Sequence, residues 1–305
     1  MATQKLGWRG IILSVIGAVL LIVGILWITV IFPALAQIPT NYERSYYFDG
    51  NFAVLDPATQ SMISFPTEQT LAQKAIGMQD GALLIHEKRT IINAATQTDL
   101  SSVYGDENTM AIERKTLKFV PAIDERGRTG YWAPPRGLGP GDSFDIWNPS
   151  VNKPLTATYV KSEEFRGLKV VVFQMSASDV SLGTNPQSQL PMFLSTTVNL
   201  FIEPKTGTVV DQNAATTTSM DMGGNKVPVL IANVGWTEAT IAELVDVAKN
   251  GLGMLFWFET ILPWLLVGIG AVLLILGVIL IAWRHESKVD RRGGATIPRR
   301  RGATA

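Results

Sequence analysis

The sequence predicts a membrane-anchored α+β protein in which a β-rich extracytoplasmic domain lies between an N-terminal and a C-terminal transmembrane helix. One long apolar run lies near each end of the chain, Ile11–Ala36 and Ile261–Trp283. Because a helix rises about 1.5 Å per residue, about 20 apolar residues cross a hydrocarbon layer of about 30 Å. The segment between the runs contains stretches of alternating apolar and polar residues, which are typical of strands.

The positive charge lies at the two ends of the chain. Residues 1–10 and 284–305 together hold nine basic and two acidic residues, a net charge of +7, and because the whole chain is neutral the middle carries −7. By the positive-inside rule both termini are cytoplasmic at the plasma membrane. The predicted division is a cytoplasmic N-terminus (1–10), a transmembrane helix (11–36), the β-rich domain (37–260), a second transmembrane helix (261–283) and a basic cytoplasmic tail (284–305).

The first apolar run has an alternative reading as a cleaved signal peptide. Ala34-Leu35-Ala36 follows Pro33 and fits the small-residue pattern of a cleavage site. The apolar core of a signal peptide is typically about 7–15 residues long, whereas Ile11–Phe32 is longer. The length favours an uncleaved anchor.

Glycines recur at a seven-residue step in both runs. They are Gly10, Gly17 and Gly24 in the first run, and Gly270 and Gly277 in the second. Seven residues is nearly two helical turns, so each set forms a small-residue stripe along which helices in lipid can approach closely. We expect the two anchors to pack along these stripes. The alternative is that glycine is simply common in membrane helices.

Aromatic and basic residues at the ends of the anchors predict a membrane-interface belt. Rings with a polar edge favour the headgroup zone, and basic residues near the surface attract anionic lipids. The bilayer is therefore an expected partner, and no nucleic-acid partner is expected. The predicted interface residues are Trp8, Trp257, Trp264, Trp283, Arg284, Arg291 and Arg292.

The middle segment is predicted to be mostly strand. Apolar–polar alternation, or a continuous β-branched run in the case of Val170–Phe173, marks the strands. A turn at Glu203–Gly207 predicts a hairpin, and Ala133–Pro140 predicts a surface loop. The expected strands are Ala82–Ile92, Thr109–Val120, Leu155–Lys161, Leu168–Met175, Thr196–Glu203 and Thr208–Val210.

Two helices are predicted within this middle segment. Phe65–Met78 places Leu71, Ala75 and Met78 at helical spacing, and Thr237 can cap a helix before the second anchor. The aromatic stretch Asn41–Gly50 is expected to pack on the β-core, with the lining of an apolar groove as the alternative.

The sequence gives little support to catalysis. Cysteine is absent, so disulfides and thiol chemistry are excluded. Gly141-Asp142-Ser143 resembles an esterase nucleophile block, but its serine needs a histidine base, and His86 is the only histidine of the middle segment. A turn is the favoured interpretation. No phosphate-binding glycine motif or metal-ligand loop occurs, and no cofactor or metal is expected.

Several short stretches of the middle segment carry a resemblance to known proteins, namely Phe144–Pro149, Lys153-Pro154, Tyr159, Glu163–Val170 and Glu203–Gly207. They resemble a family of bacterial, mainly actinobacterial, membrane proteins labelled the porin PorA family. The family label implies a channel, and its members carry a β-rich extracytoplasmic domain between two terminal helices. The layout is also similar to that of CD36-type receptors, which bind lipids.

The functional prediction is a non-catalytic, membrane-anchored binding or scaffold protein of the cell envelope. A hydrophobic ligand such as a lipid, or another envelope protein, is the expected partner. The alternative is a homo-oligomeric channel assembled through the glycine stripes, because two helices alone cannot enclose a pore. A hydrolase using Ser143 and His86 is the third hypothesis.

Overall fold

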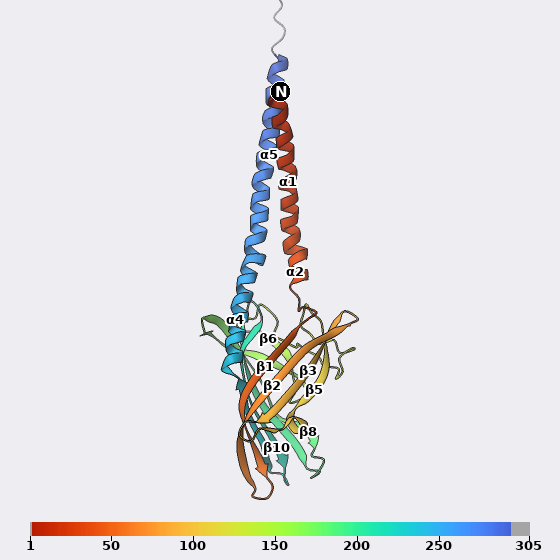
Figure 1. The fold of residues 1–305 in the computed structure, drawn as a ribbon, viewed down its shortest axis with the longest axis vertical. Helices are drawn as coiled ribbons and strands as arrows, with labels where there is room; N and C mark the ends of the chain where they lie inside the picture. The colour runs from red at the N-terminus through yellow and green to blue at the C-terminus, as the bar shows by residue number, and fades with distance from the viewer. Residues whose placement is uncertain (1, 294–305) are drawn as a thin grey trace, which may run out of the picture. The chain divides into compact units, whose positions relative to one another are not determined.

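The computed structural model describes the backbone of residues 2–293 and the side chains of residues 8–283. The chain forms two compact units (Figure 1). A helical unit comprises the two ends of the chain, up to Ala36 and from Gly253 onward, and a β-rich unit spans Gln37–Leu252.

The β-rich unit is built on one antiparallel sheet of eleven strands. Its order is β4-β3-β2-β1-β11-β10-β9-β8-β7-β6, with β5 also paired to β3. The strands are β1 (Glu43–Asp56), β2 (Ser61–Gln79), β3 (Ala82–Asn93), β4 (Thr98–Asp99), β5 (Asp106–Ile112), β6 (Ser143–Asn148), β7 (Lys153–Phe165), β8 (Leu168–Thr184), β9 (Pro191–Glu203), β10 (Thr208–Asp221) and β11 (Lys226–Trp236). The short helix α3 (Ser101–Tyr104) lies between β4 and β5.

The sheet is not a closed barrel, and an irregular segment joins its two outer strands. We call residues 113–142 the strap. Phe119 of the strap forms a bridge with Ile112 at the end of β5, and Tyr131 forms a parallel bridge with Ile146 of β6. Within the strap, Lys118 and Tyr131 are bridged to each other. The strap therefore continues the wall of the unit across the gap between β5 and β6.

Helix α4 (Glu238–Leu255) packs against strands β8 and β10. Its apolar face, which includes Ile241, Val245 and Ala248, contacts Val170 of β8 and Val210 of β10. The predicted cap is confirmed, because the Thr240 amide donates to the Thr237 hydroxyl at 3.2 Å.

Most predicted strands are confirmed, and two predictions are wrong. The predicted helix Phe65–Met78 is instead part of strand β2, whose buried residues Thr67, Gln69 and Gln73 recur at a period of two. These inward residues are polar. The apolar residues of the stretch, taken alone, therefore suggested a helical period that the chain does not follow. The predicted strand Thr109–Val120 ends at Ile112, and the chain turns back through Leu117, which has a φ of 63°.

The other elements of the sheet agree with the sequence or extend it. Val170–Phe173 is buried on both faces of β8, as its continuous apolar run predicted. The turn at Glu203–Gly207 joins β9 to β10 in antiparallel register. Ala133–Pro140 contains no helix or strand, as predicted, but it is not entirely on the surface, because Pro134 and Leu138 are buried. Strands β1, β4, β6 and β11 were not predicted.

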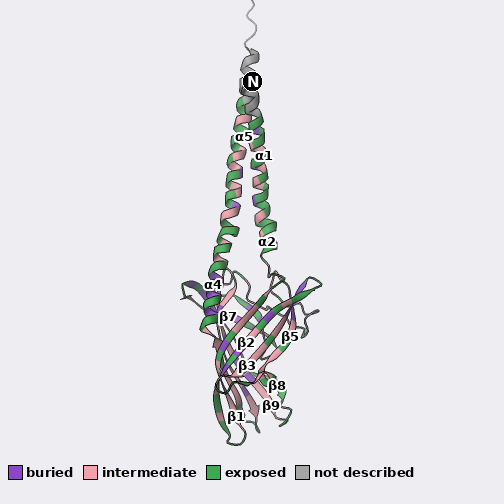
Figure 2. Cartoon of the chain, viewed as in Figure 1, coloured by how far each residue is buried: buried purple, intermediate pink, exposed green. Residues whose placement is uncertain are grey.

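The helical unit contains two long helices with exposed apolar surfaces (Figure 2). The first runs through α1 (Ala2–Leu26), a π-helical turn η1 (Trp27–Ile31) and α2 (Phe32–Leu35). The second continues from α4 through the π-helical turn η2 (Phe256–Ile261) into α5 (Leu262–Gly293). Within the described residues, two helical stretches are long and apolar enough to cross a membrane, Trp8–Leu35 and Glu238–Trp283.

The structure brings the predicted glycines together where α1 contacts α5. A Cβ added to Gly17 lies 2.6 Å from the Gly270 carbonyl oxygen, and one added to Gly10 lies 2.9 Å from the Gly277 carbonyl oxygen. A Cβ on Gly24 lies 2.9 Å from a methyl group of Val267. Such distances leave no room for a larger side chain, so the backbones approach closely along this line.

Adding a side chain at this contact is expected to separate the helices. In Gly17→Val the new Cβ lies 2.5 Å from the Leu274 amide nitrogen, and overpacking of this kind costs about 1–3 kcal/mol. Gly268→Val is the matched control, because nothing lies within 4 Å of its added Cβ. Unfolding by sodium dodecyl sulfate in mixed micelles is expected to occur at a lower detergent fraction for Gly17→Val only. Equal shifts in both variants would contradict the close contact.

Candidate functional site

The interior of the β-rich unit contains a cavity of about 460 Å³. This volume lies in the range of about 300–1,000 Å³ that is usual for small-molecule sites. Its lining comes from nine of the eleven strands, from the strap and from α4. A sheet whose inward face is only partly filled by side chains therefore forms a chamber.

One wall of the cavity is polar and lies on the neighbouring strands β1, β2, β3 and β5. In one cross-strand row, Arg44 pairs with Gln73, which pairs with Glu87, which pairs with Asn108. All four residues line the cavity. Residues that pair across adjacent strands share one face of the sheet, so this row forms a continuous polar strip.

A second row follows two residues further along the same strands. It runs from Tyr46 through Leu71 and Arg89 to Asp106, and again all four residues line the cavity. The two rows together place hydrogen-bonding and charged groups on one side of the chamber.

The opposite wall lies on β8, β9 and β10 and carries no charged side chain. Its apolar residues Met175, Val198, Leu200 and Ala214 belong to or pack on the buried apolar cluster of β6–β9. Uncharged polar residues lie beside them, namely Thr196, Thr208, Gln212 and Thr216. Tryptophan rings complete the lining at Trp132, Trp147 and Trp236. The cavity is thus amphipathic, with its charged side chains on β1, β3, β5 and the strap and an uncharged, largely apolar lining on β8–β10.

A chain of hydrogen bonds fixes the polar wall. The Tyr42 hydroxyl lies 3.2 Å from the Tyr46 hydroxyl and donates to Gln73 Oε1 at 3.0 Å. Gln73 in turn donates to Glu87 Oε2 at 2.6 Å. Burial, together with the neighbouring Tyr46, raises the pKa of the Tyr42 phenol far above its usual value. Tyr42 therefore stays neutral and acts as a fixed donor.

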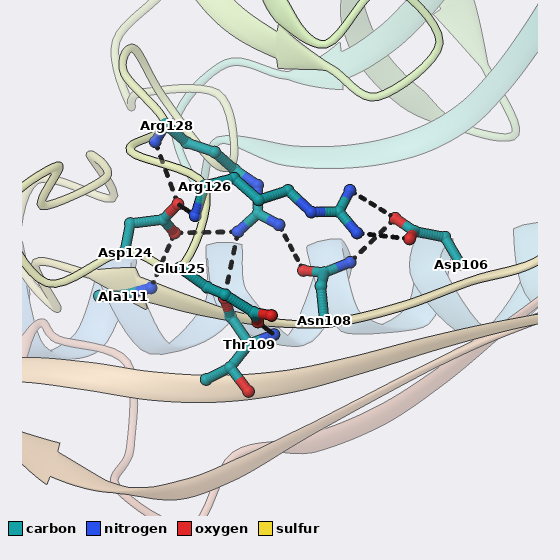
Figure 3. Close-up of polar contacts among 8 residues, drawn as sticks. All are labelled: Asp106, Asn108, Thr109, Ala111, Asp124, Glu125, Arg126 and Arg128. Atoms are coloured by element: carbon teal, nitrogen blue, oxygen red, sulfur yellow. Dashed lines mark hydrogen bonds and ion pairs between the residues drawn. The ribbon is translucent and has the colours of Figure 1, made fainter.

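A buried ion pair holds the strap against β5 (Figure 3). Arg128 Nη1 lies 2.9 Å from Asp124 Oδ2, and the two side chains are 4% and 0% exposed. Asp124 also accepts from the Ala111 amide of β5 at 3.1 Å, and Arg128 donates to Asn108 Oδ1 at 2.5 Å. The pair thus has the additional hydrogen bonds that a buried ion pair requires.

A second, more exposed ion pair lies beside it. Arg126 donates to both carboxylate oxygens of Asp106, at 2.8 and 2.5 Å (Figure 3). The hydrogen bonds from Arg126 hold the pKa of the Asp106 carboxyl below its usual value. At the β1 end of the same wall, Arg44 pairs with Glu243 of α4 at 3.1 Å.

The sequence did not identify this site. Only the aromatic stretch at the start of β1 was associated with a groove, as the alternative to core packing. The structure shows that Tyr42, Tyr46 and Phe48 of this stretch line the cavity. A usable signal was the period of two in Thr67, Gln69, Leu71 and Gln73, in which polar residues occupy inward positions.

The predicted membrane-interface residues lie in the helical unit. Trp8, Trp257, Trp264 and Trp283 are 60–68% exposed. The backbone of Arg284, Arg291 and Arg292 belongs to α5, and their side chains lie outside the described part of the chain, as does the tail from residue 294. At the two π-helical turns, the ring nitrogen of Trp27 donates to the Phe258 carbonyl at 2.8 Å. The Trp27 and Phe258 rings also stack, with their centroids 6.3 Å apart.

The structure does not join the predicted nucleophile to a base. Ser143 is exposed at the start of β6, and no hydrogen bond connects it to His86, whose ring lies 3.2 Å from Glu107 on β5. Asp142 accepts from the Gly139 amide at 2.8 Å, as expected for a turn. Among the described residues, no group of three or more histidine or acidic side chains could hold a metal ion.

Comparison with known proteins identifies the family. The family profile described as Porin PorA matches residues 9–279, from the first membrane helix through most of the second. The chain belongs to the Porin PorA family. Together with the two apolar helices, this membership identifies a membrane-associated protein.

Other comparisons add little to the PorA-family assignment. No curated protein matches the chain in sequence. The solved structure of Rv2717c from M. tuberculosis matches with a TM-score of 0.28 and 9% identity, covering 63% of this chain and 92% of that one. At that score and identity, this neighbour says nothing about ligand or activity.

Removing one member of the buried pair is expected to destabilise the PorA-family chain strongly. Asp124→Ala leaves the Arg128 guanidinium buried without its carboxylate, which costs about 3–5 kcal/mol of unfolding free energy. Glu107→Gln removes a carboxylate from an exposed pair with Lys88 and is the control, with no measurable change expected. Chemical denaturation of the two variants measures the difference. Similar stability of both would show that the strap is held by other contacts.

Proposed function

We propose that this chain is a non-catalytic, membrane-anchored binding protein that holds a small amphipathic molecule inside its β-rich unit. The observation that carries the proposal is the amphipathic cavity of about 460 Å³. A scaffold needs only a filled core, because unfilled volume costs packing energy. A cavity with a polar wall and an apolar wall is suited to a molecule that has both characters.

The aromatic lining supports the same proposal. The rings of Tyr46 and Trp236 stack at 5.7 Å, and Trp132 meets the Tyr42 ring edge-on at 5.5 Å. All four residues line the cavity. Such rings present large apolar faces next to polar edges. They are therefore suited to contact a ligand where its apolar part meets its polar part.

The channel alternative derives from the family description. The contact between α1 and α5 already uses the glycine stripes within one chain, which removes the predicted surface for assembly between chains. Conductance across planar bilayers tests the alternative directly, because a monomeric binding protein gives none.

The proposed topology places the β-rich unit outside the cytoplasm. The cysteine-free chain allows single-site labelling. Ala58→Cys lies at the exposed turn between β1 and β2, and Ala305→Cys lies in the basic tail. A membrane-impermeant maleimide is expected to label position 58 in intact cells and position 305 only after lysis. The reverse pattern would invert the topology.

Filling the cavity is expected to abolish binding. Ala214→Phe projects a ring into the chamber from β10, whereas Ala215→Phe, on the next residue, places the same ring on the exposed face. A brominated lysophospholipid quenches nearby tryptophans, and three of them line the cavity. Quenching is expected to need at least tenfold more ligand in Ala214→Phe than in Ala215→Phe. Equal quenching in the two variants would exclude the cavity as the binding site.

A further inference from the structure

Six charged side chains line the cavity, and only some of them are neutralised. Arg126 pairs with Asp106, Arg128 with Asp124, and Arg44 with Glu243. Glu87 and Arg89 are the remaining two lining charges, and neither forms an ion pair with any residue that the structure describes. The cavity therefore presents one carboxylate and one guanidinium that make no ion pair at contact distance, although Arg89 lies near enough to Asp106 to contribute to the lowered pKa of that carboxyl.

These two charges have a fixed spatial relation. They lie two residues apart on β3 and so on the same face of the sheet. At about 3.4 Å per residue, their Cα atoms are about 7 Å apart. Half-buried charges are disfavoured unless they are paired or hydrogen-bonded. An anion alone would satisfy Arg89 but would be repelled by Glu87. A cation alone would satisfy Glu87 but would be repelled by Arg89.

Glu87 is positioned to receive an ammonium group. Its Oε2 is held by Gln73 at 2.6 Å, at the end of the chain that begins at Tyr46. No described residue donates a hydrogen bond to its Oε1. Tyr42 and Tyr46 also line the cavity, and the Tyr42 hydroxyl reaches this carboxylate through Gln73. The free Oε1 of the carboxylate attracts an ammonium or a quaternary ammonium group by its charge.

Arg89 is positioned to receive an anion. Its neighbour across the strands is Asp106, both of whose carboxylate oxygens are already taken by Arg126. The Arg89 guanidinium makes no hydrogen bond to a described residue, so its planar fork of N–H donors is available. This geometry suits a phosphate or carboxylate.

We propose that the cavity recognises a zwitterionic head group, with its ammonium on Glu87 and its phosphate on Arg89, carried by a single-chain membrane lipid. This inference rests on the proposed function and specifies the ligand class. The apolar wall on β8–β10 receives the acyl chain. The apolar lining residues on β8–β10 favour a head group that carries an acyl chain over a free, water-soluble zwitterion.

Three amphiphiles with the same dodecyl chain test the head group. They are dodecylphosphocholine, dodecyl phosphate and dodecyltrimethylammonium, each titrated into the full-length protein in a nonionic maltoside detergent. Tryptophan fluorescence reports binding, and native mass spectrometry reports stoichiometry. The zwitterion is expected to bind about tenfold or more tightly than either single-charge compound, because it alone satisfies both side chains. Phosphocholine without a chain is expected to bind weakly, which separates a lipid from a water-soluble ligand.

Two variants assign the contacts. Glu87→Gln keeps an acceptor oxygen but removes the negative charge, so the preference for the zwitterion over dodecyl phosphate is expected to disappear. Arg89→Gln is expected to remove the preference over dodecyltrimethylammonium. Lys88→Gln, which changes the exposed residue between them, is the control and is expected to keep the wild-type selectivity. Because each result is a ratio measured within one variant, partial unfolding does not mimic it.

The outcomes separate this inference from the proposed function. If all three dodecyl compounds bind alike, and Ala214→Phe still abolishes their binding, the cavity binds amphiphiles and the head-group inference is overturned. Unchanged selectivity in Glu87→Gln and Arg89→Gln overturns it as well. If no amphiphile binds to the wild-type protein, the proposed function fails too.

Discussion

The buried ion pair between Asp124 and Arg128 is the contact on which the cavity depends. The sheet is open between β5 and β6, and without the strap its interior would be exposed there. Both charges lie in the strap, and their remaining hydrogen-bonding groups are satisfied by Asn108, Thr109 and Ala111 of β5. The Arg128 guanidinium also lies 5.7 Å from the Phe119 ring and 6.0 Å from the Trp147 ring. One polar cluster thus fixes a segment that has no regular structure of its own.

The sequence predicted the parts of the fold whose residues follow the ordinary apolar pattern. The strand through Val170–Phe173 is apolar on both faces because α4 covers one and the core the other. Strand β2 was misread because its inward face carries Thr67, Gln69 and Gln73 next to Leu71. Polar residues at buried positions do not resemble a core, and a cavity wall needs them. The element that the sequence misassigned therefore belongs to the candidate site.

The helical unit was predicted in more detail than the site for a related reason. A seven-residue step of glycines is a local pattern with one geometric meaning, because only one helix face carries it. Gly17 and Gly270, which lie close to each other where α1 contacts α5, belong to the predicted stripes, whereas other residues of the contact, such as Leu21 and Leu274, do not. The cavity has no comparable pattern. Its charged lining residues Arg44, Glu87 and Asp106 are distant in sequence, and only the register of four strands brings them together.

The interior of the β-rich unit is less stable than an apolar filling would make it. Besides the unpaired charges on β3, the buried side-chain atoms Thr67 Oγ1, Gln69 Nε2 and Trp236 Nε1 have no hydrogen-bond partner among the described residues. Each such group costs about 1–3 kcal/mol. Gln69 and Trp236 both pair with Phe48 of β1, so two of these three groups flank one position on the inward face. An interior that is both incompletely filled and incompletely hydrogen-bonded is poorly suited to a scaffold and well suited to a protein that binds a polar guest.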